Sequence, residues 1–462
     1  MNNKGRWVVV WIGLFLMVLT VGGFLIKGII DNALYNRFPD RGVPRINIDL
    51  NGVSLEEIKS GSKETKYEGN DLQVYDGGEI LEYGGVEIKG RGNGTWVQEK
   101  KPFQIKFENK VDMFGMGAAR KWYLLANALD GTNLRTLAAF YIEEMLGMKY
   151  IYYGQFVELY VDGDYEGLYC LTHAVEVGKN TVDLRNPMGI IMEIDNIYGD
   201  SEDNYVTGNG NLMVIKDLVN EENREAAVLD FLVNYDKLER AIYDNDYKKV
   251  KELADTESLV QYYLISEFSV NPDAYWTSFY FYKDGIGDKI HAGPMWDFDL
   301  AFSNRRWGNW LGERLYSSTE KMARKNEILP KEIYEIEGLN MDDYVSSLKI
   351  NTLVYDLMEM SEFQDEVKEV FNKKMSGRRD EFVNKLKVKQ NEIYNLAVVN
   401  EEKWIEESEN MKKNLKSVFG DRITEGYEFE MEFDVMLNWI RQRYDYFEQE
   451  YGEGLQKNIL YI

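Results

Sequence analysis

The strongest constraint on the fold is a change of periodicity along the chain, from short alternating runs to a helical repeat. Residues 46–110 alternate apolar and polar side chains in runs broken by glycine, which is typical of strands. Apolar residues recur at helical spacing over 132–146, and Gly147 follows as a C-cap. Residues 221–268 also show a helical period. This order predicts an α+β fold with a strand-rich first half and a helical second half.

Shorter segments complete the predicted architecture. Asp162-Gly163, between alternating apolar flanks, predicts a hairpin turn. Residues 189–195, GIIMEID, are typical of a buried strand, and a second hairpin is predicted over 278–296. The chain after residue 310 is helical in pattern and acidic. At 462 residues, the chain is long enough for one large domain or two of ordinary size.

Charge and residue usage exclude several classes of function. The chain has 54 basic and 79 acidic residues, a formal net charge of −25, which disfavours nucleic acid as a partner. An anionic ligand such as a nucleotide therefore needs a local basic pocket, a cation, or both. Cys170 is the only cysteine, which excludes a disulfide framework and a cysteine-based zinc site. His173 and His291 are the only histidines, so histidine-rich catalysis is not expected.

The N-terminus carries a candidate membrane span. Residues 7–26 form an unbroken apolar or small-residue run, about the length that crosses the hydrocarbon core as a helix. A cleaved signal peptide is the alternative, but no small-x-small cleavage site follows. We expect a single-pass protein of the cell membrane, and the short N-terminal segment favours placing the large domain outside the cytoplasm. The predicted divisions are a cytoplasmic tip and transmembrane helix, a juxtamembrane linker, a main domain, and a helical acidic extension of that domain, at 1–30, 31–45, 46–310 and 311–462.

A glycine-rich loop is one candidate binding element. Gly90, Gly92 and Gly94 lie between two predicted strands, where absent side chains let backbone N–H groups approach a ligand. Basic residues surround this loop: Arg91, Lys100, Lys101 and Lys106. The loop matches neither the Walker A pattern nor the dinucleotide fingerprint. A phosphate cradle and an ordinary hairpin loop are both compatible with it.

A second candidate element runs from residue 266 to residue 299. Its order is a helix, Asp273, Ser278 five positions later, a hairpin, and then Asp297 and Asp299. Protein kinases use the same order for a catalytic-loop Asp, a metal-binding residue, a hairpin and a metal-binding Asp. Asp273 alone is also compatible with a turn residue. A purely structural role is less plausible for Asp297 and Asp299. Residues i and i+2 of an extended chain point to one face, and two like charges that close need a cation or a raised pKa.

A glycosidase is the rival interpretation of these acids. Carboxylates two residues apart on a strand lie about 7 Å apart at the backbone and point the same way, at a rise of about 3.3 Å per residue. Asp297 and Asp299 are therefore poorly placed to flank one glycosidic bond.

With these motifs in view, the chain resembles the CotH family of spore-coat kinases, which also occurs in bacterial surface proteins. The resemblance spans residues 45–310. It rests on ordered blocks: IKGRGNGTW…KKPFQIKF, KWYLLANALDGTNLRTLAAFYIEEMLG, FVELYVDGDYEGLYCLTHAVEVGKN, GIIMEID, EFSVNPDAYWTSFYFYKD and AGPMWDFDLAFSN. It implies an atypical, reduced protein-kinase-like fold that uses ATP and Mg²⁺ or Mn²⁺ to phosphorylate serine or threonine hydroxyls of a coat or surface protein.

The resemblance also implies residue roles. Asp273 becomes the catalytic-loop acid, and Asp297 the metal-binding acid, with Ser278 and Asp299 beside it. Glu193 and Asp195 would lie near the nucleotide. The residues that would face the phosphates are Arg91, Asn93, Lys101 and Lys106.

Two departures from the family pattern leave a second hypothesis open. Ser278 stands where many members have Asn, and it is a poorer metal ligand. His173 stands where the family has Glu, which removes a partner for a phosphate-binding lysine unless Glu176 replaces it. The two hypotheses are a membrane-anchored kinase and a surface interaction or structural module with little or no transfer activity.

Overall fold

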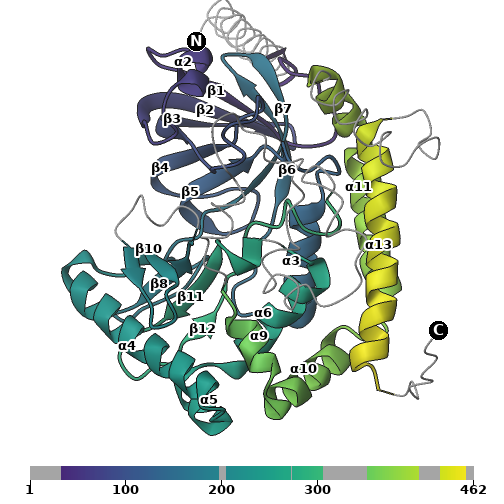
Figure 1. Cartoon of the computed structure of the whole chain (residues 1–462). Coiled ribbons are helices and arrows are strands. Elements are labelled where there is room, and N and C mark those ends of the chain that lie inside the picture. The colour runs from purple at the N-terminus through teal and green to yellow at the C-terminus, as the bar shows by residue number, and fades with distance from the viewer. Residues whose placement is uncertain (1–32, 197–203, 272, 305–350, 405–426, 454–462) are drawn as a thin grey trace, which may run out of the picture.

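The computed structural model describes residues 33–196, 204–271, 273–304, 351–404 and 427–453. Within these residues a strand-rich first half precedes a helical second half, so the α+β prediction is confirmed. Figure 1 shows a barrel above, a smaller sheet below it, and two long helices along one side.

The strand-rich part is a closed barrel with the strand order β1-β2-β3-β4-β5-β7-β6. Neighbouring strands are antiparallel except β1 and β6, whose parallel pairing closes the barrel. Its interior is filled by buried apolar side chains such as Ile46, Val74, Ile105 and Trp122. A short helix, α2 (Leu55–Ser60), lies between β1 and β2 in sequence. The barrel strands are β1 (Arg45–Asp49), β2 (Tyr67–Asp76), β3 (Glu79–Gly90), β4 (Phe103–Asp112), β5 (Ala118–Leu125), β6 (Gln155–Val161) and β7 (Asp164–His173).

The second sheet has the strand order β12-β11-β8-β10-β9 and is antiparallel throughout. Alternation along its strands separates two faces. Met192 and Phe281 belong to the large helical core, whereas Ile191 and Tyr280 belong to a separate cluster on the other face. The strands are β8 (Ile190–Ile194), β9 (Asn204–Val206), β10 (Leu212–Leu218), β11 (Phe279–Lys283) and β12 (His291–Ala292).

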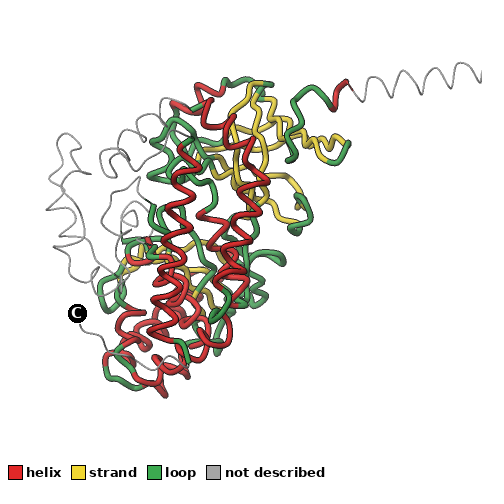
Figure 2. Tube along the Cα trace, turned by 90° about the vertical axis from the view of Figure 1, so that its right-hand side faces the viewer, coloured by secondary structure: helices red, strands yellow, loops and turns green. Residues whose placement is uncertain are grey.

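Helices cover this sheet and connect it to the barrel. Figure 2 shows α11 and α13 running side by side along the molecule, and they pack against each other. The helices are α3 (Arg135–Leu146), α4 (Arg224–Tyr243), α5 (Tyr247–Leu253), α6 (Thr256–Ser269), α9 (Leu353–Met358), α10 (Ser361–Lys374), α11 (Arg379–Lys403) and α13 (Glu428–Tyr451), with 3-10 turns η2 (Glu221–Asn223) and η3 (Asp273–Tyr275).

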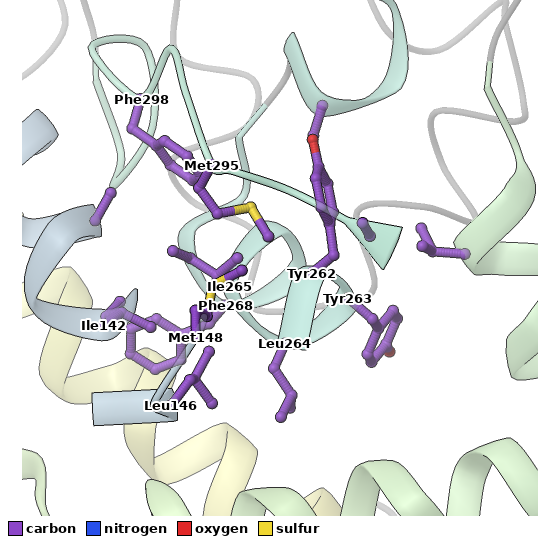
Figure 3. Packing of buried hydrophobic residues seen from close by; sticks show 14 of the residues in the cluster. Ile142, Leu146, Met148, Tyr262, Tyr263, Leu264, Ile265, Phe268, Met295 and Phe298 are labelled. Carbon is purple, nitrogen blue, oxygen red and sulfur yellow. The ribbon is translucent and has the colours of Figure 1, made fainter. Parts of the chain in front are cut away.

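The helical core anchors the segment that carries Asp297. Side chains from α3, α6 and residues 295–298 converge in Figure 3, where Ile142, Ile265 and Phe268 lie near Met295 and Phe298. Met295 and Phe298 are almost fully buried. The backbone at Asp297 is therefore held by apolar side chains on both sides of it.

The predicted turns are confirmed. Gly147 ends α3 in the left-handed conformation with φ 70°, which glycine adopts without steric cost. Asp162 and Gly163 have φ 51° and 89° between β6 and β7, as a tight hairpin turn requires. The second hairpin pairs β11 with β12.

The predicted membrane span at 7–26 lies outside the described residues. Among the residues that are described, no helix combines the length and apolar character needed to cross a bilayer. Phe38, in the predicted linker, packs against Tyr75 and Tyr160 of the barrel.

Candidate active site

A cavity of about 800 Å³ lies between the barrel and the second sheet. This volume is within the range of small-molecule sites. The barrel contributes the glycine-rich loop after β3 and Tyr123 of β5 to the cavity. The residues on either side of Tyr123, Trp122 and Leu124, point into the barrel core because side chains alternate along a strand. The sheet contributes Glu193 of β8 and Tyr280 of β11, both on the face that points away from the large helical core. The cavity thus lies where the barrel and the second sheet meet.

Asp273, Asp297 and Asp299 lie close together in the lining of this cavity. One carboxylate oxygen from each lies within 4.8 Å of the others. The expectation of an extended chain at the acid pair is wrong, because β12 ends at Ala292 and Asp297 has φ 66°. The turn still leaves both side chains facing the cavity, together with Asp273 from η3.

The backbone around the acids is strained and cross-linked. Val270, Ser278 and Asp297 all have positive φ, at 50°, 55° and 66°, which non-glycine residues rarely adopt. Asn271 joins the two acidic segments, since its Nδ2 donates to the carbonyl of Asp297 at 3.0 Å and its Oδ1 accepts from the amide of Asp273 at 3.3 Å. Ser278 Oγ donates to Asp297 Oδ2 at 3.1 Å. Strain of this kind is retained where surrounding contacts enforce it, and it is concentrated at functional sites.

Burial and mutual repulsion raise the pKa values of two of the acids, Asp273 and Asp299. Desolvation, followed by the charges of Asp297, Asp299 and Asp195, raises the pKa of Asp273 well above its usual value. Desolvation and Asp297 likewise raise the pKa of Asp299 to about 8, although Arg91 opposes this shift. Both shifts have the cause expected of carboxylates crowded into a site made for a positive charge.

The donor set fits a hard divalent cation. Mg²⁺ and Mn²⁺ prefer oxygen ligands, and Mg²⁺ sites in nucleotide enzymes use one or two carboxylates together with phosphate oxygens. Asp297 and Asp299 would supply those carboxylates. The Ser278 hydroxyl, bonded to Asp297, is placed to orient this carboxylate or to join the ligands.

An ion pair between a partly buried lysine and a buried carboxylate lies on the sheet side of the cavity. Lys216 Nζ is 3.1 Å from Glu193 Oε2, and Tyr280 donates its hydroxyl to Glu193 Oε1 at 2.9 Å. Burial opposes the charge of Lys216, but Glu193 and Tyr280 outweigh it and raise the pKa of the lysine. Lys216 is therefore a fixed positive charge inside the cavity.

The glycine-rich loop forms the opposite wall. The guanidinium of Arg91 stacks 4.4 Å from the centroid of the Tyr123 ring and 5.8 Å from that of Trp296. Asn93 Oδ1 accepts a hydrogen bond from Lys63, which also lines the cavity. A Cβ at Gly90 would lie 2.5 Å from the Trp96 ring, so the loop needs glycine there for close packing.

Some predicted residues lie elsewhere. Lys101 donates to the Trp96 carbonyl at 2.6 Å, and Lys106 is 3.9 Å from Glu87; neither lines the cavity. His173 Nε2 is 2.9 Å from the carbonyl of Gly117, and burial lowers its pKa. Glu176 pairs with Lys121 at 3.2 Å, and both are outside the cavity lining. By contrast, Arg91, Asn93, Glu193, Asp195, Asp273, Ser278, Asp297 and Asp299 all line it.

Sequence reasoning missed Lys216 and the aromatic pair of Tyr123 and Trp296. Lys216 occupies a bulge where the β10–β8 register shifts between Ile215 and Asp217. A bulge changes the direction of one side chain, and the run LMVIKDL contains no local pattern that predicts a bulge. The available signal was a lysine inside an apolar strand, which requires a buried partner.

Comparison with known proteins agrees with this geometry. The sequence model of the family described as CotH kinase protein matches residues 87–447, which is most of the chain. No curated protein matches the chain. The family match includes the glycine-rich loop, the acid cluster and the C-terminal helices, and the chain therefore belongs to the CotH kinase family.

Proposed function

We propose that the chain is a protein kinase dependent on ATP and Mg²⁺ or Mn²⁺, built on a reduced protein-kinase-like fold. It would transfer the γ-phosphoryl group to a serine or threonine hydroxyl of a surface or coat protein. The observation that carries the proposal is the meeting of Asp273, Asp297 and Asp299 within 4.8 Å in a cavity that also holds Lys216. Family membership supports kinase chemistry in general.

The nucleotide would occupy the cavity between the loop and the sheet. Tyr123 and Trp296, with ring centroids 5.6 Å apart, offer aromatic surface for the base. Arg91, Asn93 and Lys216 would face the phosphates. Glu193 would hold Lys216 in place, as a carboxylate does for the phosphate-binding lysine of protein kinases.

The acids would divide the chemistry. Asp297 and Asp299 would hold the cation, which when bound neutralises charge on the phosphates. Asp273 would orient the acceptor hydroxyl. As the acceptor oxygen bonds to the γ-phosphorus and the bond to the bridging oxygen of ADP breaks, the hydroxyl proton would pass to a carboxylate oxygen of Asp273. Asp273 must be ionised to accept this proton, and a cation held beside it would favour the ionised form by offsetting the neighbouring carboxylate charges that raise its pKa.

We further propose that residues 7–26 anchor the protein in the cell membrane with the large domain outside the cytoplasm, and that 46–310 and 311–462 form one domain. Protease added to intact cells should cleave the large domain. Protection of the domain in intact cells, with cleavage after lysis, would reverse the orientation.

Binding by the purified full chain in detergent tests the enzymatic proposal. Calorimetry should detect ATP binding with Mg²⁺ or Mn²⁺ and none with EDTA. Incubation with γ-labelled ATP should label the protein or an added acceptor. Metal-dependent binding without transfer would favour the alternative of an inactive interaction module, to which Ser278 in place of the family Asn points. No metal-dependent binding would remove the kinase proposal.

A further inference from the structure

We infer that α13 positions the acid cluster and that Glu432, Trp439 and Arg443 are the positioning residues. The roles given to the acids rest on the proposed function. These three residues are spaced by seven and four positions. At about 100° per residue, such spacing places them on one stripe of the helix. Each is buried, and each contacts a different segment that borders the cavity.

Glu432 holds the loop that precedes α3. Its Oε2 accepts from Arg135 Nη1 at 2.9 Å, and the same nitrogen donates to Asp130 Oδ1. Asp130 also accepts from the backbone amides of Thr132 and Arg135, at 3.0 and 2.8 Å. A Cβ on Gly131 would lie 2.7 Å from the Glu432 carboxyl group, so loop and helix are in close contact.

This loop is joined to Asp299. Asn304 Nδ2 donates to the carbonyl of Leu129 at 2.6 Å and to the carbonyl of Asp299 at 2.5 Å. Leu129 and Asn304 both line the cavity. A displacement of the Asp130 loop would therefore be transmitted to the backbone of Asp299.

Trp439 supports the segment after Asp299 directly. Its ring meets that of Phe302 edge-on, at 6.3 Å between centroids and 90° between planes. The Phe302 amide donates to the carbonyl of Ser269 at 2.8 Å. Trp439 thus packs against the point where the Asp299 segment is tied to the end of α6.

Arg443 holds the last turn of α6. Its Nη2 donates to the carboxylate of Glu267 at 2.8 Å and to the carbonyl of the same residue, and its Nε donates to the carbonyl of Phe268 at 3.2 Å. Both charged side chains are essentially buried, at 0% and 2% exposure. This turn leads through Val270, in its strained conformation, into Asp273.

One helix therefore fixes all three segments that carry or support the acids. Carboxylates within 4.8 Å repel one another, and without rigid backbone support they would move apart. Residues that hold metal-binding carboxylates without touching the metal commonly change affinity or activity by about 10–100-fold when mutated. The C-terminal extension would thus be part of the active-site machinery.

Glu432→Gln in the full chain tests this inference. It keeps the shape of the side chain but removes the charge opposite Arg135. We expect the Kd for Mn²⁺, measured with ATP present, to rise by about 10–100-fold. Hydrogen exchange without metal should accelerate at the amides of Thr132 and Arg135.

The matched control is Glu158→Gln. Glu158 is a fully buried carboxylate paired with Arg41 at 2.6 Å in the barrel, away from the cavity lining. It should lower thermal stability without changing the Mn²⁺ Kd or hydrogen exchange at residues 127–135.

Arg443→Lys is the second variant, should Glu432→Gln not fold. It keeps the charge but loses the bond to Phe268, so exchange should accelerate over residues 267–273 and Mn²⁺ affinity should fall. If either folded variant matches Glu158→Gln in both measurements, the inference is wrong. If the wild-type protein binds no Mn²⁺, the proposed function fails, and the exchange data alone decide whether α13 positions these segments.

Discussion

Asp297→Asn is the perturbation that best separates a functional acid from a structural one. The substitution keeps the side-chain shape and leaves Ser278 Oγ an amide oxygen in place of Asp297 Oδ2. It removes one negative charge from a cluster whose oxygens lie within 4.8 Å. Two unit charges at that separation repel by about 3.5 kcal/mol at an effective dielectric constant of about 20.

The net effect on stability is smaller than this value. Asp273 and Asp299 have raised pKa values and carry only part of a charge near neutral pH. We therefore expect the metal-free variant to be more stable than wild type by about 1–3 kcal/mol at pH 8. Transfer activity should be lost, because the principal metal ligand is gone.

Urea unfolding at pH 8 with EDTA measures the first effect, and the same titration with Mg²⁺ and ATP measures the second. Ligand binding stabilises the native state, so wild type should gain stability with Mg²⁺ and ATP and Asp297→Asn should not. Asp284→Asn is the control, since Asp284 accepts from the amides of Arg185 and Asn186 at 2.7 and 2.9 Å. It should lose about 1 kcal/mol and keep the ligand response. Destabilisation of Asp297→Asn to the same extent, or an intact ligand response, would refute the reasoning.

Three further predictions concern separate parts of the molecule. Lys216→Met should abolish Mg·ATP binding and cost about 1–3 kcal/mol, because Glu193 loses its charged partner but keeps the hydrogen bond from Tyr280. Lys216→Met/Glu193→Gln should recover stability but not binding, and recovered binding in calorimetry would contradict the role of Lys216. Tyr123→Leu should weaken Mg·ATP binding about tenfold through lost stacking, and an unchanged Kd would place the base elsewhere. Burial raises the pKa of Glu143 well above its usual value of 4.5, so the wild-type protein loses stability as the pH rises above 4.5 and the unfolded chain ionises. Relative to wild type, Glu143→Gln should therefore gain about 1.4 kcal/mol of stability per pH unit above about pH 5, until the pH reaches the native pKa of Glu143. A stability difference that does not change with pH in urea titrations would exclude a buried, protonated Glu143.

Local patterns in the sequence were enough to predict many of the elements and several turns, although α2, β9 and β10 were not predicted. Gly147 and Asp162-Gly163 were identifiable because positive φ is a property of the residue and its immediate neighbours. The order of Asp273, the hairpin and Asp297 was enough to associate these acids, since a short hairpin returns the chain to its starting point. The α+β division followed from periodicity alone.

Other features depended on contacts between residues far apart in sequence. Lys101 and Lys106 resemble phosphate ligands in sequence, yet Lys101 bonds to Trp96 and Lys106 lies near Glu87, while Lys216 reaches the cavity through a strand bulge. These choices are set by strand register and by which face of a strand each side chain occupies. The sequence by itself determined the α+β division, many of the elements and the acids of this protein. Only tertiary packing decided which cations face those acids and that α13, which begins at Glu428, holds them together. Burial and ion pairing depend on which residues the fold brings into contact, and no local run of residues determines that.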